Sequence, residues 1–303
     1  MIDRIAEERR IAVYLTDRLG GGWHASCVSA RMKAGRVEAV FRAEGPDGRR
    51  LAIKQCAHPR KAINEFSALQ ALAAASSDCV RPVFLNDQAS LFAMEWIEAP
   101  TIKQLMHQPS RLDLIRKAGR WLRALHRATR HWTPQRDPQI EGALLIDPQA
   151  PEFRRVNDRL RARRARLGIR FLFHSLLHSD FHMGNLFVVD GRAVAFDPLA
   201  MRRGTPMFDV ADFLVLSEIY RLHAQTQGNA WPDCERRDRQ AFLEGYGRLA
   251  PWQNRLLAFA MDVKIARMWH HHAKSAHRTL LEESEFALLQ NAMRDRALLG
   301  HAP

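Results

Sequence analysis

The sequence predicts an α+β fold in which a β-rich N-terminal lobe of about 100 residues precedes a larger, mostly helical lobe. Three strand-like runs, at 23–31, 37–43 and 51–56, follow one another closely with short loops between them. After Glu98-Ala99-Pro100 the pattern changes, and helical periodicity dominates to the end of the chain. We therefore expect one lobe at 1–97 and a second at 98–303.

The N-terminal lobe is predicted to be a small antiparallel sheet of about five strands with one internal helix. The first helix is amphipathic, and Gly20-Gly21-Gly22 ends it. Gly45-Pro46-Asp47-Gly48 is a turn signal that joins the second and third strands as a hairpin. The expected elements in order are helix 2–19, strands 23–31, 37–43 and 51–56, helix 59–75, and strands 80–85 and 90–97.

The C-terminal lobe is predicted to begin with two helices, for which Thr101 and Ser110 are suitable N-caps. Helical patterns continue from there, with one interruption at 172–197. That stretch alternates short apolar runs with polar turns, including Asp190-Gly191, which is a hairpin signal.

Composition restricts the function class. The chain has 303 residues and a formal net charge of +13, from 46 Lys+Arg against 33 Asp+Glu. Its tryptophans are scattered without the interleaving typical of nucleic-acid binding, so we expect no nucleic-acid partner. Its four cysteines include no C-x-x-C pair, and no apolar run reaches the roughly 18 residues of a membrane span. We expect a cytoplasmic protein whose charge favours anionic ligands over polycations.

The stretch from His178 to Asp197 carries the chemistry. Asp180 follows His178 by two residues and precedes Asn185 by five, which is the H-x-D-x-x-x-x-N spacing of a kinase catalytic loop. Phosphoryl transfer needs a carboxylate to orient the attacking hydroxyl and accept its proton, and Asp180 suits that task. It also needs hard oxygen ligands for Mg²⁺ on the nucleotide phosphates, which Asn185 and Asp197 offer from the two strands of one hairpin.

Two motifs resemble a known family. His178-Ser179-Asp180-Phe181-His182-Met183-Gly184-Asn185 is similar to the H-G-D-x-H-P-G-N loop of aminoglycoside phosphotransferases and choline kinase relatives. Gly204-Thr205-Pro206-Met207-Phe208-Asp209-Val210-Ala211 is similar to the family's G-D-P-x-x-D-L-A segment. These proteins are small-molecule kinases with a protein-kinase-like fold. The resemblance implies ATP and Mg²⁺ as cofactors, and structural support of the loop by His178, His182 and Asp209.

The N-terminal lobe carries the same resemblance. Leu51-Ala52-Ile53-Lys54 is similar to the V-A-I-K strand, which implies that Lys54 contacts the nucleotide phosphates and that Glu65 pairs with Lys54. Phe92 to Ile97 is similar to the hinge strand, which implies adenine binding at Glu95 and Ile97. Gly35 is the single glycine of the expected phosphate loop.

The loop departs from the family pattern at several positions. Ser179 stands where the family has a glycine, Met183 where it has a proline, and Thr205 where it has an aspartate. Pro198 follows Asp197, where many members have an aromatic residue.

The acceptor is left open by the sequence. We expect a hydroxyl of a small molecule, either a sugar, an aminoglycoside-like compound or a related metabolite. The acidic cluster Glu282-Glu283-Glu285 favours a polycation, whereas the net charge opposes one. Eight arginines at 154–170 suggest an electropositive helix near the catalytic cleft. They also leave two alternatives: a kinase of a membrane-surface sugar or lipid head group, and a non-catalytic kinase-like module that binds a partner.

Overall fold

The computed structural model describes residues 3–33, 36–86, 88, 90–133, 151–167, 172–199, 201–226, 228, 235–275 and 278–299. The chain forms two compact units. The first comprises Met1–Ala99 together with Val194–Met201, and the second comprises Pro100–Ala193 together with Arg202–Pro303. The predicted α+β class is confirmed. Residues 194–201 pack with the first unit, although the sequence analysis assigns everything after residue 97 to the second lobe.

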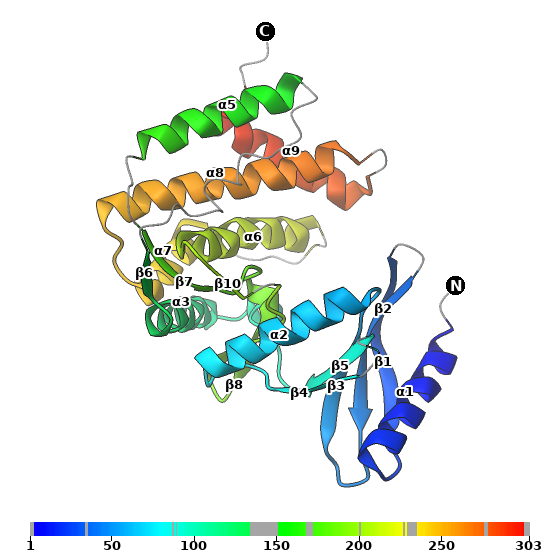
Figure 1. The fold of residues 1–303 in the computed structure, drawn as a ribbon. Helices are drawn as coiled ribbons and strands as arrows, with labels where there is room; N and C mark the ends of the chain where they lie inside the picture. Colours follow the sequence, from blue (N-terminus) through cyan, green and yellow to red (C-terminus); the bar gives the residue numbers. More distant parts are fainter. Residues whose placement is uncertain are drawn as a thin grey trace. The chain divides into compact units, whose positions relative to one another are not determined.

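The first unit is built on a five-stranded antiparallel sheet with the strand order β1-β2-β3-β5-β4. The helices expected at 2–19 and 59–75 are confirmed as α1 and α2 (Figure 1). The elements are α1 (Arg4–Leu19), β1 (His24–Lys33), β2 (Arg36–Glu44), β3 (Arg50–Gln55), α2 (Pro59–Ala75), β4 (Pro82–Leu85) and β5 (Leu91–Glu95).

The two helices of the first unit pack on opposite faces of the sheet. Ile11 and Leu15 of α1 join a buried cluster with Phe41 and Ile53, which occupy one face because side chains alternate along a strand. Phe92 of β5 points to the other face, where its ring lies 5.9 Å from that of Phe66 in α2. Lys54 is the register partner of Phe92 and therefore also faces α2.

The second unit is mostly helical. It contains a small sheet with the order β10-β7-β6, which the sequence analysis did not anticipate, and the chain crosses between units along the β8–β9 hairpin. Its elements are η1 (Lys103–Leu105), α3 (Arg111–Ala128), β6 (His131–Thr133), α5 (Pro151–Arg166), β7 (Leu172–Leu177), η2 (Met183–Asn185), β8 (Leu186–Val189), β9 (Arg192–Ala195), β10 (Arg202–Gly204), α6 (Met207–Thr226), α7 (Glu235–Tyr246), α8 (Pro251–Ala273) and α9 (Leu280–Asp295).

The β8–β9 turn follows the prediction from Asp190-Gly191. Asp190 has φ 48° and Gly191 has φ 72°, and two successive positive φ angles are typical of the type I′ turn that suits a two-residue hairpin. Asn185 comes directly before β8, and Asp197 follows two residues after β9. None of the described helices has the length and apolarity needed to cross a membrane.

Helices of the second unit stack in layers. In Figure 1, α8 lies between α6 on one side and α5 on the other. Helix α5 buries Val156 and Leu160 completely, so its apolar side faces inward while much of its arginine content remains at the surface. The loop from His178 to His182 connects β7 to η2 and packs on the first turn of α6.

Candidate active site

A fully buried carboxylate holds the loop that precedes Asp180. Asp209 lies in the first turn of α6 with no exposed surface. Its Oδ2 accepts a hydrogen bond from the backbone N–H of His178 at 2.8 Å, and its Oδ1 accepts one from the backbone N–H of Ser179 at 2.9 Å. His126 Nε2 of α3 lies 3.2 Å from Oδ2. Both carboxylate oxygens are therefore engaged by groups that fix the loop.

Asp180 is fixed from its other side by Asn185. The Asn185 Nδ2 donates to the Asp180 carbonyl at 3.0 Å and to Asp180 Oδ2 at 3.2 Å. Burial opposes ionisation of Asp180, but the hydrogen bond and charge of His182, with His178 and Lys264 adding to them, lower its pKa below the ordinary value. Asp180 is consequently a carboxylate at neutral pH, able to accept a hydrogen bond or a proton.

His182 stabilises the turn that follows Asp180. Its Nδ1 accepts a hydrogen bond from the backbone N–H of Gly184 at 3.0 Å, and the Tyr220 hydroxyl lies 3.1 Å from the same atom. Because Nδ1 is an acceptor, Nε2 carries the proton in the neutral ring. Nε2 lies 3.6 Å from Asp180 Oδ2, so its N–H faces the carboxylate.

His178 has a packing role. Its side chain is fully buried, and its ring lies edge-on to both Trp121 and Phe181. The ring of Trp121 stacks on that of Phe181 with 5.5 Å between centroids. This aromatic cluster anchors the loop beneath Asp180.

The backbone explains one departure from the family pattern. Ser179 has φ 64°, which lies in the left-handed region where glycine is favoured. The glycine that the family uses here would adopt this conformation without strain, whereas Ser179 adopts it while its N–H is held by Asp209.

Three charged side chains of the first unit meet, from β3, α2 and the segment that follows β9. Lys54 Nζ lies 2.9 Å from Glu65 Oε2 and 2.5 Å from Asp197 Oδ1. Only 16% of the Lys54 side chain is exposed. Burial opposes the charge of Lys54, but Asp197 and Glu65 outweigh it and raise the pKa of the lysine, which stays protonated. The structure thus brings together Lys54, Glu65 and Asp197, three residues that the sequence analysis singles out.

A second lysine extends this network, and sequence reasoning missed it. Lys61 Nζ lies 2.5 Å from Glu38 Oε1 and 3.6 Å from Glu65 Oε1. Burial opposes ionisation of Glu38, but Lys61 and Arg31 outweigh it and lower the pKa of Glu38 to about 2. The signal was available in part, because Lys61 precedes Glu65 by four residues on a helix. Glu65 is therefore held between two cations, one of which is Lys54.

The expected hinge lies at the end of β5. The Glu95 N–H donates to the Arg81 carbonyl at 2.9 Å, so that donor is already committed. Within the described residues, the backbone of half-buried Ile97 has no hydrogen-bond partner. Ile97 therefore offers free backbone groups to a ligand, whereas Glu95 retains fewer. Gly35, expected in the phosphate loop, lies outside the described residues.

The two proposed metal ligands present oxygen atoms. Asn185 uses its amide nitrogen on Asp180, which leaves its Oδ1 available. Asp197 binds Lys54 through Oδ1 and keeps Oδ2. No group of three or more acidic, histidine or cysteine side chains able to hold a metal occurs among the described residues. Each of these oxygens is of the kind that Mg²⁺ prefers in proteins.

The arginine-rich helix α5 uses two of its arginines in contacts within the second unit. Arg163 of α5 contacts the Asp262 carboxylate of α8 and the Arg296 carbonyl, and Arg159 donates to the Ala297 carbonyl. These carbonyls follow the C-terminus of α9, where cations are favourable. In Figure 1, α8 lies between α5 and α6, so α5 packs on the side of α8 away from the helix whose first turn holds the loop 178–182.

The acidic cluster is also committed to internal contacts. Glu282 completes a capping box with Thr279, and Glu283 pairs with Arg278. Glu285 contacts His223 and lies 3.0 Å from His272 Nε2. His272 is thus a nearly buried partner of a carboxylate.

The first unit combines a sheet and helices with a lysine–glutamate pair. The second, helical unit carries an H-x-D-x-x-x-x-N loop that a buried aspartate holds in place. Together these features define a protein-kinase-like phosphotransferase. Residues 31–254 match the phosphotransferase enzyme family, APH. The chain therefore belongs to that family of small-molecule phosphotransferases.

Solved structures share the fold. Amicoumacin kinase hAmiN, solved with AMP-PNP, Ca²⁺ and Ami, has a TM-score of 0.61 at 14% identity, covering 99% of this chain and 98% of its own. Choline kinase LicA from Streptococcus pneumoniae has a TM-score of 0.61 at 12% identity, covering 96% and 99%. The aminoglycoside-3'-phosphotransferase of type VIII has a TM-score of 0.56 at 18% identity, covering 87% and 99%. A search of curated proteins gave no match.

Proposed function

We propose that this protein transfers the γ-phosphoryl group of ATP to a hydroxyl of a small-molecule acceptor. The observation that carries the proposal is the environment of Asp180. Asn185 holds its carbonyl and carboxylate, Asp209 holds the two preceding backbone amides, and its pKa is lowered. A carboxylate held in this way can orient an attacking hydroxyl and accept its proton as the P–O bond forms.

The other site residues act on the nucleotide. Lys54 would bind the phosphates, because it is a buried cation that stays protonated. Glu65 would keep the Lys54 side chain extended toward them, and Ile97 would bind the adenine through its backbone. A Mg²⁺ ion held by Asn185 and Asp197 would neutralise charge on the phosphates when bound. With Asp197 engaged in holding the ion, Lys54 would be free to bind phosphate oxygens.

The charges near Asp180 favour an acceptor that is neutral or anionic. The acidic residues that favoured a polycation are each engaged by Thr279, Arg278, His223 or His272. Lys103 instead lies half-buried with its Nζ 4.2 Å from the Tyr220 ring centroid, and burial lowers its pKa. Lys103 forms no ion pair in the described part of the chain. Since Tyr220 contacts His182 and His182 faces Asp180, Lys103 is well placed for an anionic group on the acceptor.

The test is a phosphate-transfer assay with Mg²⁺ and γ-labelled ATP against a panel of sugars, sugar acids, sugar phosphates, aminoglycosides and choline. We expect label transfer to a neutral or anionic hydroxyl compound. Asp180→Asn should reduce turnover by about 10²–10⁴-fold while ATP affinity, measured by calorimetry, stays within about twofold. Asp158→Asn is the matched control, because Asp158 is 70% exposed on α5.

Two results would contradict the proposal. Near wild-type turnover in Asp180→Asn would remove Asp180 from its assigned role. Absence of ATP binding by the wild-type chain in the presence of Mg²⁺ or Ca²⁺ would indicate a non-catalytic module. Transfer restricted to aminoglycosides or choline would leave the activity intact and refute only the assignment of the acceptor class.

A further inference from the structure

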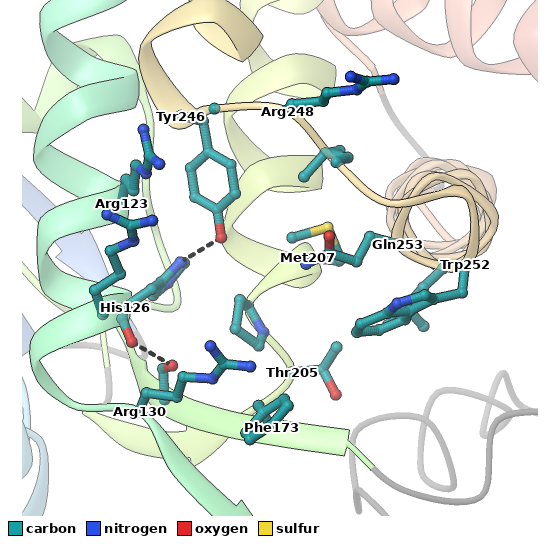
Figure 2. Close-up of a pocket in the computed structure, with 16 residues that line it drawn as sticks. Arg123, His126, Arg130, Phe173, Thr205, Met207, Tyr246, Arg248, Trp252 and Gln253 are labelled. Atoms are coloured by element: carbon teal, nitrogen blue, oxygen red, sulfur yellow. Dashed lines mark hydrogen bonds between the residues drawn. The ribbon is translucent and has the colours of Figure 1, made fainter.

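The second unit contains a pocket of about 310 Å³ that is separate from the residues assigned to catalysis. Helix α3 forms one wall with Arg123, His126 and Arg130, and Trp252 and Gln253 at the start of α8 form the other (Figure 2). A volume of this size is sufficient for a small organic molecule.

The charge of the lining is one-sided. Its cations are Arg123, Arg127, Arg130 and Arg248, and no described lining residue is an aspartate or glutamate. None of the four guanidinium groups has a hydrogen bond or an ion pair among the described residues. The nearby Glu244 is already paired with Arg116 at 2.8 Å. Four guanidinium groups that form no ion pair in the described part of the chain surround this cavity. They favour an anion, because Arg binds carboxylate or phosphate oxygens through paired N–H donors.

The remaining lining is apolar and partly planar. The Arg130 guanidinium stacks 3.4 Å above the centroid of the Phe173 ring. Trp252 faces these two residues across the cavity, with Met207 beside it in Figure 2. A flat apolar group can lie against Trp252 while an attached anionic group reaches Arg130. The lining thus fits a planar organic anion better than an inorganic ion.

The pocket wall is connected to the catalytic loop. His126 Nδ1 lies 3.0 Å from the Tyr246 hydroxyl, and both residues line the cavity (Figure 2). On its other side, His126 Nε2 contacts Asp209, which holds the backbone amides of His178 and Ser179. Ser175, also in the wall, donates to the His126 carbonyl at 2.7 Å. A ligand that packs against His126 and Tyr246 therefore restrains the side chain that supports Asp209.

We propose that this pocket binds a small organic anion that combines a planar apolar part with a phosphate or carboxylate, and that binding stabilises the loop 178–180 through His126 and Asp209. The proposal concerns binding and loop stability, so it is independent of the phosphotransferase assignment. Two readouts test it, and neither requires turnover.

The first readout is calorimetric titration of the full chain with 1-naphthyl phosphate, 1-naphthoate, 1-naphthol and inorganic phosphate. We expect the two naphthyl anions to bind at least tenfold more tightly than naphthol or phosphate. Arg123→Gln and Arg130→Gln should each weaken the naphthyl anions at least fivefold. Arg120→Gln, which removes an equal charge from the exposed face of α3 outside the pocket, should change affinity less than twofold. Equal affinity in all three variants would overturn the binding site.

The second readout is amide hydrogen exchange at His178 and Ser179. Saturation with 1-naphthoate should slow exchange at these two amides at least threefold in the wild type and in Arg120→Gln. In Arg130→Gln at the same ligand concentration, the slowing should be smaller, in proportion to the lost affinity. Binding that leaves exchange at His178 and Ser179 unchanged would overturn the link to the catalytic loop.

Discussion

Asp209 Oδ1 accepts the backbone N–H of Ser179 at 2.9 Å, although the two residues are 30 positions apart in the sequence. The other oxygen accepts the N–H of His178. One side chain at the start of α6 thus fixes the two peptide groups directly before Asp180. Because the loop is irregular, these backbone donors have no strand or helix partner, and the carboxylate replaces one.

Replacing Asp209 by asparagine should destabilise the protein. Asparagine keeps one acceptor oxygen, but its amide group would face a backbone N–H, leaving donors unpaired in a fully buried site. We expect a loss of about 2–4 kcal/mol in the free energy of unfolding, measured by urea denaturation. Asp158→Asn on the surface of α5 should change it by less than about 0.5 kcal/mol. An unchanged urea midpoint in Asp209→Asn would show that the clamp contributes no stability.

The conformation of Ser179 leads to a second prediction. Its φ of 64° is acceptable to glycine and costly for a β-branched residue. Ser179→Gly should keep the unfolding free energy within about 1 kcal/mol of the wild type and retain activity. Ser179→Val should lose about 2 kcal/mol or more. Thermal unfolding of both variants checks the difference, and equal melting temperatures would contradict a strained backbone at this position.

Much of the fold was predictable because its signals are local. Helix 59–75 was placed within its final bounds, since a proline at the start and an apolar stripe define it. Asp190-Gly191 specified the hairpin turn through its need for positive φ. By contrast, β6 and β10 are three residues each and pair with β7 from distant parts of the chain. Strands this short are too brief to show the apolar–polar alternation typical of a strand, and only tertiary packing selects them.

The candidate site shows the same division. The spacing of Asp180 and Asn185 was readable because five residues of loop bring them together. Lys61, which supports Glu65 from a second side, was missed because a lysine near a helix start is ordinarily solvated. Arg163 is the opposite case, because an arginine run predicts an exposed basic face whereas Arg163 forms internal contacts. Its partners Asp262 and Arg296 lie 99 and 133 residues away, beyond the reach of any local pattern.

Glu65 should affect nucleotide binding only through Lys54. Glu65→Gln should weaken ATP affinity about 3–10-fold in the wild-type background, because Lys54 loses one of its two carboxylate partners. In a Lys54→Met background the same change should have less than a twofold effect. Calorimetric titration of the double-mutant cycle with AMP-PNP provides the measurement, and Glu98→Gln, at an exposed carboxylate, is the control. Additive effects of the two substitutions would show that Glu65 affects ATP binding independently of Lys54.

Lys103 is expected to select the acceptor. Lys103→Gln should raise KM for an anionic acceptor about tenfold, as expected for loss of one charged hydrogen bond, and should leave KM for ATP unchanged. Lys103→Arg should recover part of the affinity, because it restores the cation. Lys117→Gln on α3 is a matched control at a lysine already paired with Asp113. Equal KM values for the acceptor in wild type and Lys103→Gln would exclude Lys103 from acceptor recognition.

Asp212 should make stability depend on pH in a defined window. Burial raises its pKa to about 6, although Lys264 lies 2.8 Å away and acts in the opposite direction, while Asp209 and Asp180 add to the rise. Between about pH 4 and pH 6, the folded state therefore holds a proton on Asp212 that the unfolded state, in which the pKa is 3.8, has released. Its contribution is fully present below about pH 4 and is lost as the pH rises through about 6, by about 3 kcal/mol in total. Asp212→Asn has no such proton to lose.

The difference in unfolding free energy, wild type minus Asp212→Asn, should thus fall between pH 4 and pH 6.5 and then level off. Urea denaturation at half-unit steps of pH gives this difference, in which other titrating groups cancel. A difference that rises over this window would mean that Lys264 dominates and that Asp212 is a stabilising carboxylate.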